Sequence, residues 1–230
     1  MSLGIARVVA EGTWFIPTRR TPYWEGVFSS LSALTGMFGS LDLHSYRHST
    51  RVAQLSIALG ADIGHSESDL ALIGLGGLLH DLGKLTVSKR VLLKPGSLTN
   101  REFELVREHP ARGARILSAF EPLNVPFIRD IVLHHHERLD GSGYPDGLIG
   151  AQLGVAVRIV AVADVFDALT SNRPYRSAMG SREAVDILQR ESDEGRLDAE
   201  VVALVRRYVL RTKTWTRLAG WDSNNSTKAM

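Results

Sequence analysis

Apolar residues recur with helical spacing along most of the chain, and this pattern predicts an all-α protein. Helices are expected over residues 27–38 and 44–59, and in the second of these His44, His48 and Val52 follow one face. Residues 155–169 are apolar and rich in β-branched side chains, a composition that would also suit a strand. Their length and the spacing of their alanines favour a buried helix.

Polar residues mark where the earlier helices begin and end. Ser66-x-x-Asp69 resembles a capping box in front of an apolar run that reaches residue 82, and Gly83 suits a helix stop. Thr99-x-x-Glu102 has the same capping pattern. We therefore expect one helix after each of these two motifs.

Similar signals delimit the later helices. The helix that follows residue 99 is expected to end near His109, because Pro110 disfavours the helical conformation of the residue before it. A shorter helix is expected over 111–120, and Pro126 suits the first turn of the next one. Ser181 and Asp198 are the expected caps of the last two helices.

The same pattern suggests a domain organisation. Residues 1–40 are expected to form an N-terminal arm or helix, residues 41–212 a single helical domain, and residues 213–230 a flexible tail. No segment has the length of a membrane span or the form of a signal peptide, so membrane insertion is not expected.

Composition narrows the chemistry. The chain has no cysteine, which excludes disulfides, thiolate metal sites and cysteine nucleophiles, and is compatible with a cytoplasmic location. Any metal must therefore be held by nitrogen and oxygen ligands, which favours Fe, Mn, Zn, Ni or Mg. The net charge of +2 gives no reason to expect a nucleic-acid polymer as partner.

Histidine and aspartate are concentrated at places that suit a metal site. His134, His135 and His136 run directly into a glycine-rich loop, and imidazole is the commonest neutral metal ligand. His80-Asp81 ends an apolar run, and Asp164 interrupts another. A carboxylate in such surroundings needs a compensating partner, either a metal or a basic side chain.

Each of these residues also has an ordinary structural interpretation. The His44–His48 pair could be a polar helix face, and His109 could interact with a helix C-terminus. Asp167 could support a ligand or cap a helix. Lys84, Arg173 and Arg176 could contact phosphate or form surface ion pairs. Taken together, five segments that each offer an imidazole or carboxylate suit a polynuclear site for phosphoester hydrolysis.

Five motifs occur in a characteristic order. They are His-Ser-x-Arg-Val (48–52), His-Asp-x-Gly-Lys (80–84), Glu-His-Pro (108–110), His-His-Glu-Arg-x-Asp-Gly-x-Gly-Tyr-Pro (135–145) and Val-Ala-Asp-Val-Phe-Asp-Ala-Leu-Thr-Ser-x-Arg-Pro-Tyr-Arg (162–176). In this order they closely resemble the HD-GYP family, the bacterial cyclic di-GMP phosphodiesterases within the HD superfamily. The resemblance runs from about residue 41 to residue 212.

The resemblance implies an HD-superfamily helical bundle with a metal centre in its core, holding two or three divalent ions, usually Fe or Mn. The implied ligands are His48, His80, Asp81, His109, His135, His136 and Asp164. Asp81 would bridge two ions. Members with three ions carry a glutamate four residues before the first histidine, and His44 stands there in this chain, which makes it a further candidate ligand.

The resemblance also implies a substrate and a set of substrate contacts. Cyclic di-GMP would be hydrolysed to pGpG, to GMP, or to both, with Asp81 and Lys84 as the catalytic candidates. Residues at phosphate-contacting or pocket-lining positions of the family are Lys84, Gly143, Tyr144, Pro145, Arg173 and Arg176. Diguanylate cyclase (GGDEF) proteins, an upstream regulatory domain and a second copy of the chain are the candidate partners.

Three other functions compete with this one. The chain could be a non-catalytic cyclic-dinucleotide sensor or protein-interaction module, although the complete ligand set argues against that as its sole role. It could also be another HD-type nucleotide phosphohydrolase or a di-iron oxygenase. The Gly-Tyr-Pro sequence at 143–145 argues against both.

Overall fold

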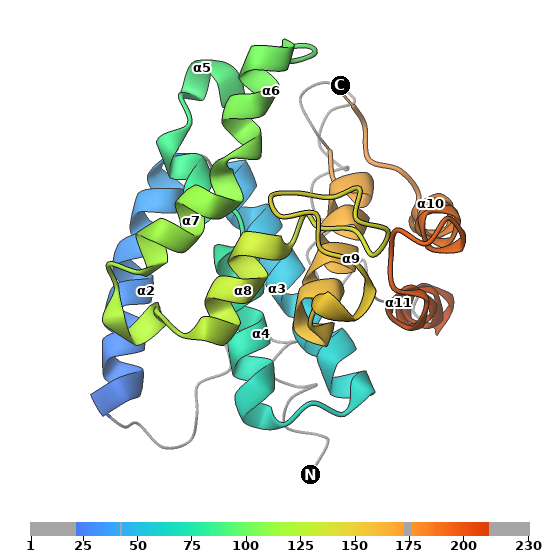
Figure 1. The fold of residues 1–230 in the computed structure, drawn as a ribbon, viewed down its shortest axis with the longest axis horizontal. Helices are drawn as coiled ribbons and strands as arrows, with labels where there is room; N and C mark the ends of the chain where they lie inside the picture. The colour runs from blue at the N-terminus through green and yellow to red at the C-terminus, as the bar shows by residue number, and fades with distance from the viewer. Residues whose placement is uncertain (1–21, 42, 173–175, 212–230) are drawn as a thin grey trace, which may run out of the picture.

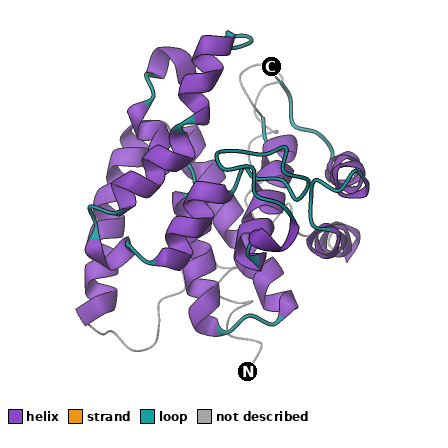
Figure 2. Ribbon diagram, viewed as in Figure 1, coloured by secondary structure: helices purple, strands orange, loops and turns teal. Residues whose placement is uncertain are grey.

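The chain folds as a bundle of helices, seen in a computed structural model that describes residues 22–41, 43–172 and 176–211. No strand occurs in these ranges, so the all-α prediction is confirmed (Figure 2). The helices are α2 (Pro22–Leu41), α3 (Leu43–Ile63), α4 (Glu67–Leu79), η1 (Leu82–Thr86), α5 (Lys89–Leu92), α6 (Asn100–Arg107), α7 (His109–Leu117), η2 (Glu121–Leu123), α8 (Pro126–His134), η3 (Gly150–Gln152), α9 (Val155–Thr170), α10 (Ser181–Asp193) and α11 (Ala199–Arg211).

The bundle is built around α3 and α4, with α8 and α9 packed against them. Figure 1 shows α2 and α7 on one side of this centre and α10 and α11 on the other. The long loop between α8 and α9 crosses in front of α9 in this view. None of the helices in the described ranges combines the length and the apolar character needed to cross a membrane.

Two apolar clusters form the core. One joins α3 and α4 to α9, α10 and α11, and includes Ile73, Phe166 and Val202. The other joins α3 and α4 to α2, α7 and α8, and includes Leu34 and Leu117. Because α3 and α4 contribute to both clusters, they hold the two halves of the bundle in a fixed relation.

The predicted helix starts are largely confirmed. The Ser66 hydroxyl accepts the N–H of Asp69 at 3.2 Å, and Thr99 and Glu102 form a complete capping box. Asp198 Oδ1 accepts N–H groups in the first turn of α11. The prediction for Ser181 is one residue out, because Gly180 is the N-cap and Ser181 is the first residue of α10.

The prediction that a helix ends near His109 is confirmed to within two residues, but His109 itself lies beyond that end. The preceding helix, α6, ends at Arg107, and His109 is the first residue of α7. Pro110 therefore occupies the first turn of a new helix, where its missing N–H costs nothing. The expected helix over 111–120 begins two residues earlier than predicted, and its first residue carries an imidazole toward the core.

Gly83 does not stop α4, which ends at Leu79. It lies inside η1, where the backbone of α7 packs directly on it. A Cβ at this position would lie 1.8 Å from the carbonyl oxygen of His109 and 2.6 Å from the backbone nitrogen of Gly113. Only glycine permits this approach, which brings the start of α7 next to the end of α4.

We expect Gly83→Ala to destabilise the fold by about 3 kcal/mol or more, because the new methyl group would push α7 away from η1. The matched control is Gly36→Ala in α2, where a Cβ meets nothing within 4 Å. That substitution should be neutral or stabilising by up to about 1 kcal/mol. Urea unfolding of both variants measures the difference, and equal stabilities would contradict the packing described here.

Candidate metal centre

Imidazole and carboxylate groups from separate helices meet between the two halves of the bundle. Most come from helix ends: His80 is the C-cap of α4, His109 begins α7, and His135 is the C-cap of α8. His48 and Asp164 come from within α3 and α9. Apart from His136, which is partly exposed, the ligands predicted from the resemblance are buried; they are His48, His80, Asp81, His109, His135 and Asp164.

Three of the imidazoles are oriented in the same way. His80, His109 and His135 each donate the Nδ1 hydrogen to the backbone carbonyl three residues earlier, at 2.7, 2.7 and 2.9 Å. Each Nε2 is thereby left as a lone-pair nitrogen that points into the site. His109 Nε2 and His135 Nε2 are only 3.2 Å apart, so two lone pairs face each other. A cation between them would relieve this repulsion.

The potential ligands fall into two groups of three whose donor atoms lie within 4.8 Å of one another. One group is His48, His80 and Asp81, and the other is His109, His135 and His136. Asp81 also reaches the second group, because its Oδ1 is 3.3 Å from His109 Nε2 while its Oδ2 is 3.4 Å from His80 Nε2.

Asp164 lies between the same two groups. Its Oδ1 is 3.1 Å from His48 Nε2, and its Oδ2 is 3.9 Å from His136 Nδ1. Two carboxylates therefore separate two sets of imidazoles. This is a suitable arrangement for a pair of divalent ions that share ligands.

Electrostatics favour cation binding. Burial and the neighbouring imidazoles hold the pKa of His135 well below its usual value, and burial lowers the pKa of His136 to about 3, so both rings are neutral. Burial by itself would raise the pKa of Asp81, but Lys84 and the adjacent histidines outweigh it and hold that pKa well below its usual range. Neutral imidazoles and ionised carboxylates are the forms that bind metals.

His48 is held by a carboxylate behind it. Its Nδ1 donates to Asp167 Oδ2 at 2.6 Å, and the guanidinium of Arg51 donates to both oxygens of the same carboxylate at 2.6 and 2.9 Å. Burial would lower the pKa of His48, but the hydrogen bonds to Asp164 and Asp167 raise it to about 9. A metal bound at Nε2 would displace this proton.

The residues present fit a divalent metal. Within the part of the chain that the structure describes, His80 Nε2 and Asp81 Oδ1 are buried and have no hydrogen-bond partner. Buried polar atoms are normally satisfied, and an ion would satisfy both. The absence of thiolate ligands favours hard or borderline ions.

The loop after α8 is organised by Glu137, whose side chain is 2% exposed. Its carboxylate accepts the N–H groups of Asp146 at 2.7 Å, Gly147 at 3.0 Å and Leu148 at 3.2 Å. Gly143 packs against this turn so closely that a Cβ would lie 2.4 Å from Glu137 Cα. The glutamate and the glycine together fix the loop beside the ligands.

Tyr144 covers the side of the site. Its ring lies 4.8 Å from that of His136, and the guanidinium of Arg107, at the end of α6, lies 4.9 Å from the centroid of the tyrosine ring. Tyr144 is joined to the half-exposed loop by a cis bond to Pro145. Gly143, Tyr144 and Pro145 lie beside the predicted ligand His136, but they are not among the residues that line the cavity above the site.

A cavity of about 910 Å³ opens above the predicted ligands. His48, Asp81, His136 and Asp164 lie on its inner surface, and its other lining residues include two predicted phosphate contacts, Lys84 and Arg176. Its volume is within the range of small-molecule sites. Arg173, the third predicted phosphate contact, lies outside the described residues.

His44 lines the same cavity at its exposed rim. Its Nε2 donates to the backbone carbonyl of Asn172 at 2.7 Å, which ties the start of α3 to the end of α9. His44 does not belong to either group of three donors. In His80, His109 and His135 it is Nδ1 that donates to a carbonyl, so His44 differs from them in the direction of its Nε2.

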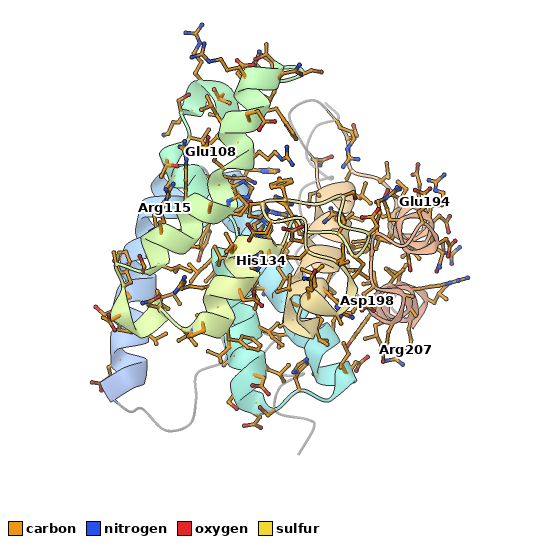
Figure 3. All side chains as sticks on the ribbon, in the orientation of Figure 1. Glu108, Arg115, His134, Glu194, Asp198 and Arg207 are labelled. Atoms are coloured by element: carbon orange, nitrogen blue, oxygen red, sulfur yellow. The ribbon has the colours of Figure 1, made fainter. Side chains whose placement is uncertain are left out.

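His134 has a different role from the two histidines that follow it. It bridges Asp130 in α8 and Asp146 in the loop, through Nδ1 at 2.7 Å and Nε2 at 3.0 Å. Figure 3 shows it at the end of α8, beside the loop. Both ring nitrogens are occupied, so this residue adds a contact between helix and loop.

Sequence reasoning gave no role to Glu137 or Arg51, although both lie within the motifs quoted above. A glutamate directly before a loop with several glycines is the signal that could have indicated an anchor for backbone N–H groups. Arg51, one turn after His48, could have been paired with Asp167 only by knowing that α3 and α9 pack together. Asp167 itself was expected either to support a ligand or to cap a helix, and it supports His48.

Comparison with known proteins identifies the family. Residues 39–201 match the family model described as HD domain. The chain belongs to the HD domain family. The cyclic di-GMP phosphodiesterase PA4108 of Pseudomonas aeruginosa is 45% identical over 144 residues, which are 63% of this chain and 34% of that protein. The motif order and such relatives identify it as an HD domain of the HD-GYP type.

Two further comparisons extend this result. The 3′3′-cGAMP-specific phosphodiesterase 1 of Vibrio cholerae is 37% identical over 193 residues, which are 81% of this chain and 44% of that protein. The chain thus spans less than half the length of these curated relatives. The HDG"Y"P protein Bd1817 of Bdellovibrio bacteriovorus has the same fold, with a TM-score of 0.59, 24% identity and coverage of 72% of this chain and 52% of that one.

We expect Asp167→Asn to weaken metal binding about 10- to 100-fold, because His48 loses the carboxylate that orients it. Chelator competition with Mn²⁺ measures the affinity. Asp198→Asn is the matched control, since Asp198 is also an arginine-paired carboxylate, 3.0 Å from Arg158, but lies outside the cavity. An unchanged Mn²⁺ affinity in Asp167→Asn would contradict this role.

Glu137→Ala should release the loop, because three backbone N–H groups lose their acceptor at a cost of about 1–3 kcal/mol for each group left unsatisfied. Hydrogen exchange followed by mass spectrometry should show faster exchange over residues 143–149 and unchanged exchange in α9. Glu183→Gln, an exposed carboxylate on α10, is the control. Protection of the loop equal to that of the parent protein would refute the proposed anchoring.

Proposed function

We propose that this protein is a metal-dependent phosphodiesterase that hydrolyses cyclic di-GMP to pGpG, to GMP, or to both. The observation that carries the proposal is the pair of three-residue donor groups, with Asp81 in one of them and Asp164 between them, at the inner end of a cavity that basic side chains also line. The relatives named as cyclic di-GMP phosphodiesterases support the choice of substrate. The relative named for 3′3′-cGAMP makes that cyclic dinucleotide the principal competitor.

In this proposal the centre holds two divalent ions, either Fe or Mn. Their ligands would be His48, His80, Asp81, His109, His135, His136 and Asp164, with Asp81 shared between the ions. The Asn172 contact of His44 argues against its binding a third ion. When bound, the ions would activate water and neutralise charge on the phosphate oxygens.

The protein's own groups would bind and orient the phosphate. Lys84 Nζ lies 2.6 Å from Asp81 Oδ2 and faces the cavity, so it can donate to a phosphate oxygen placed there. Arg176 is fixed by donating to the carbonyls of Ala168 and Leu169 at the end of α9. We assign the same phosphate-binding task to Arg173 from the resemblance alone.

The net reaction adds one water across a phosphodiester bond. The hydroxyl goes to phosphorus, the bond from phosphorus to the 3′ oxygen breaks, and that oxygen takes up the proton. Opening one of the two phosphodiesters gives the linear dinucleotide, and opening the second gives two mononucleotides. Tyr144, whose ring lies 4.8 Å from that of His136, would support this imidazole from the side away from the cavity lining.

The cellular setting is also part of the proposal. We expect action in the cytoplasm, which the absence of cysteine allows. Residues 41–212 would be the catalytic domain, regulated by an N-terminal partner domain or by diguanylate cyclase proteins. A homodimer of this chain is a further prediction.

The test is metal analysis combined with turnover on anaerobically purified protein. We expect about two Fe or Mn per chain and formation of pGpG from cyclic di-GMP, with slower turnover of 3′3′-cGAMP. Asp81→Asn should lose metal and at least about 100-fold in kcat/KM, because both donor groups lose a shared carboxylate. Chromatography of the products and elemental analysis supply the two measurements.

Asp186→Asn, an exposed carboxylate on α10, controls for the loss of one charge. Full turnover by Asp81→Asn would refute the proposal. Tight binding of cyclic di-GMP by metal-replete protein without hydrolysis would identify a sensor in place of an enzyme.

A further inference from the structure

The cavity has two side walls of similar chemistry. One comes from α9 and the segment after it, where Val165, Ala168 and Leu169 are apolar and Arg176 is basic. The other comes from the end of α5, where Leu92 and Leu93 are apolar and Lys94 is basic. Figure 1 shows α5 and α9 in separate parts of the bundle, so the two walls are supplied independently.

A cyclic dinucleotide has a matching composition. Its ring contains two phosphodiesters, each flanked by nucleosides, so one phosphate at the metal centre leaves a second phosphate and a second base to be bound elsewhere. Lys84 and Arg176 are already assigned to the phosphate that is cleaved. Leu93 and Lys94 line the same cavity but have no part in binding that phosphate.

We infer that Leu93 and Lys94 form a second subsite, which binds the half of the cyclic substrate that is not being cleaved. Lys94 donates to the distant phosphate, and Leu93 packs against the base next to it. The inference rests on the function proposed above and adds to it a reason why a cyclic dinucleotide would be preferred over a substrate with one phosphate.

The exposure of Leu93 supports this assignment. Its side chain is 52% exposed at the cavity wall, although a leucine of this size is stabilised by removal from water. A purine base placed against it would cover apolar surface that the fold leaves open. Leu105, on the neighbouring α6, is 40% exposed but does not line the cavity, and it provides a comparison.

Lys94 is held in place by a single contact, which leaves its ammonium able to donate further hydrogen bonds. Its Nζ donates to Glu102 Oε2 at 2.5 Å, and Glu102 is in turn fixed by the N–H and hydroxyl of Thr99. Among the described residues this is the one hydrogen-bond acceptor that the ammonium contacts, and an ammonium has three hydrogens. Both side chains of the pair are partly exposed, so the pair itself adds little stability.

The test compares a substrate with two phosphates and one with a single phosphate. Lys94→Met should raise the KM for cyclic di-GMP about tenfold or more, with kcat within about twofold, because a charge-assisted hydrogen bond is lost away from the bond that breaks. Hydrolysis of bis(p-nitrophenyl) phosphate, which has one phosphodiester, should be unchanged. Leu93→Ser should raise the same KM, while Leu105→Ser should not.

Glu102→Gln separates substrate binding from support of the fold. It removes the negative charge of the pair but keeps an amide oxygen, which can still accept from the Thr99 N–H and from Lys94 Nζ, so the ammonium stays in place. If Lys94 binds phosphate, Glu102→Gln keeps the parent KM for cyclic di-GMP. If Lys94→Met and Glu102→Gln impair both substrates equally, the pair only supports the α5–α6 segment and the inference is overturned.

The remaining outcomes distinguish the inference from the proposed function. Parent-like KM in Lys94→Met, with normal turnover by the parent protein, overturns the subsite and leaves the phosphodiesterase intact. If the parent protein hydrolyses neither substrate, the proposed function fails, and calorimetric binding of cyclic di-GMP decides the subsite. Weaker binding by Lys94→Met then supports it, and equal binding overturns it.

Discussion

Burial of the Asp81 carboxylate is the constraint on which the rest of the site depends. The side chain is almost inaccessible, yet its pKa lies well below the usual range, so it is charged. A buried charge is tolerated only with close compensation. Here the compensation comes from Lys84, and a cation held between Asp81 and the imidazoles of His80 and His109, which belong to different helices, would add to it. If the helix ends moved apart, this charge would become exposed to solvent or would stay buried without a partner.

Residues behind the predicted ligands hold them in place in a similar way. Asp167 is also buried and charged, and it links His48 to Arg51, so the ligand on α3 is anchored to α9. Gly83 performs the corresponding task for α7 by removing the side chain that would separate it from η1. Charge pairing and close backbone packing thus act together, because the first sets which groups must meet and the second lets the helices approach closely enough.

Local rules were sufficient for much of the fold but not for the supports of the site. The caps at Ser66, Thr99 and Asp198 follow from side chains and backbone a few residues apart, and they were predicted. The end of α6 was predicted to within two residues, but the start of α7 at His109 was not, because the break at Glu108 carries no separate signal. Glu137 was missed because its partners are backbone N–H groups, which leave no pattern of side-chain types. Pairings such as Arg51 with Asp167 depend on which helices pack together.

His135, His136 and Glu137 follow one another without a spacer. Two of them offer imidazoles to one donor group, and the third holds the backbone of the following loop. The three residues follow the end of α8 at His134, so the direction of each side chain depends on its position in the turn that begins there. Loss or gain of a single residue here would move both imidazoles out of the donor group and would move the Glu137 carboxylate away from the loop N–H groups. The segment should therefore tolerate substitutions at its neighbours far better than any change in length, and natural variation in chain length should be confined to turns that carry no ligand.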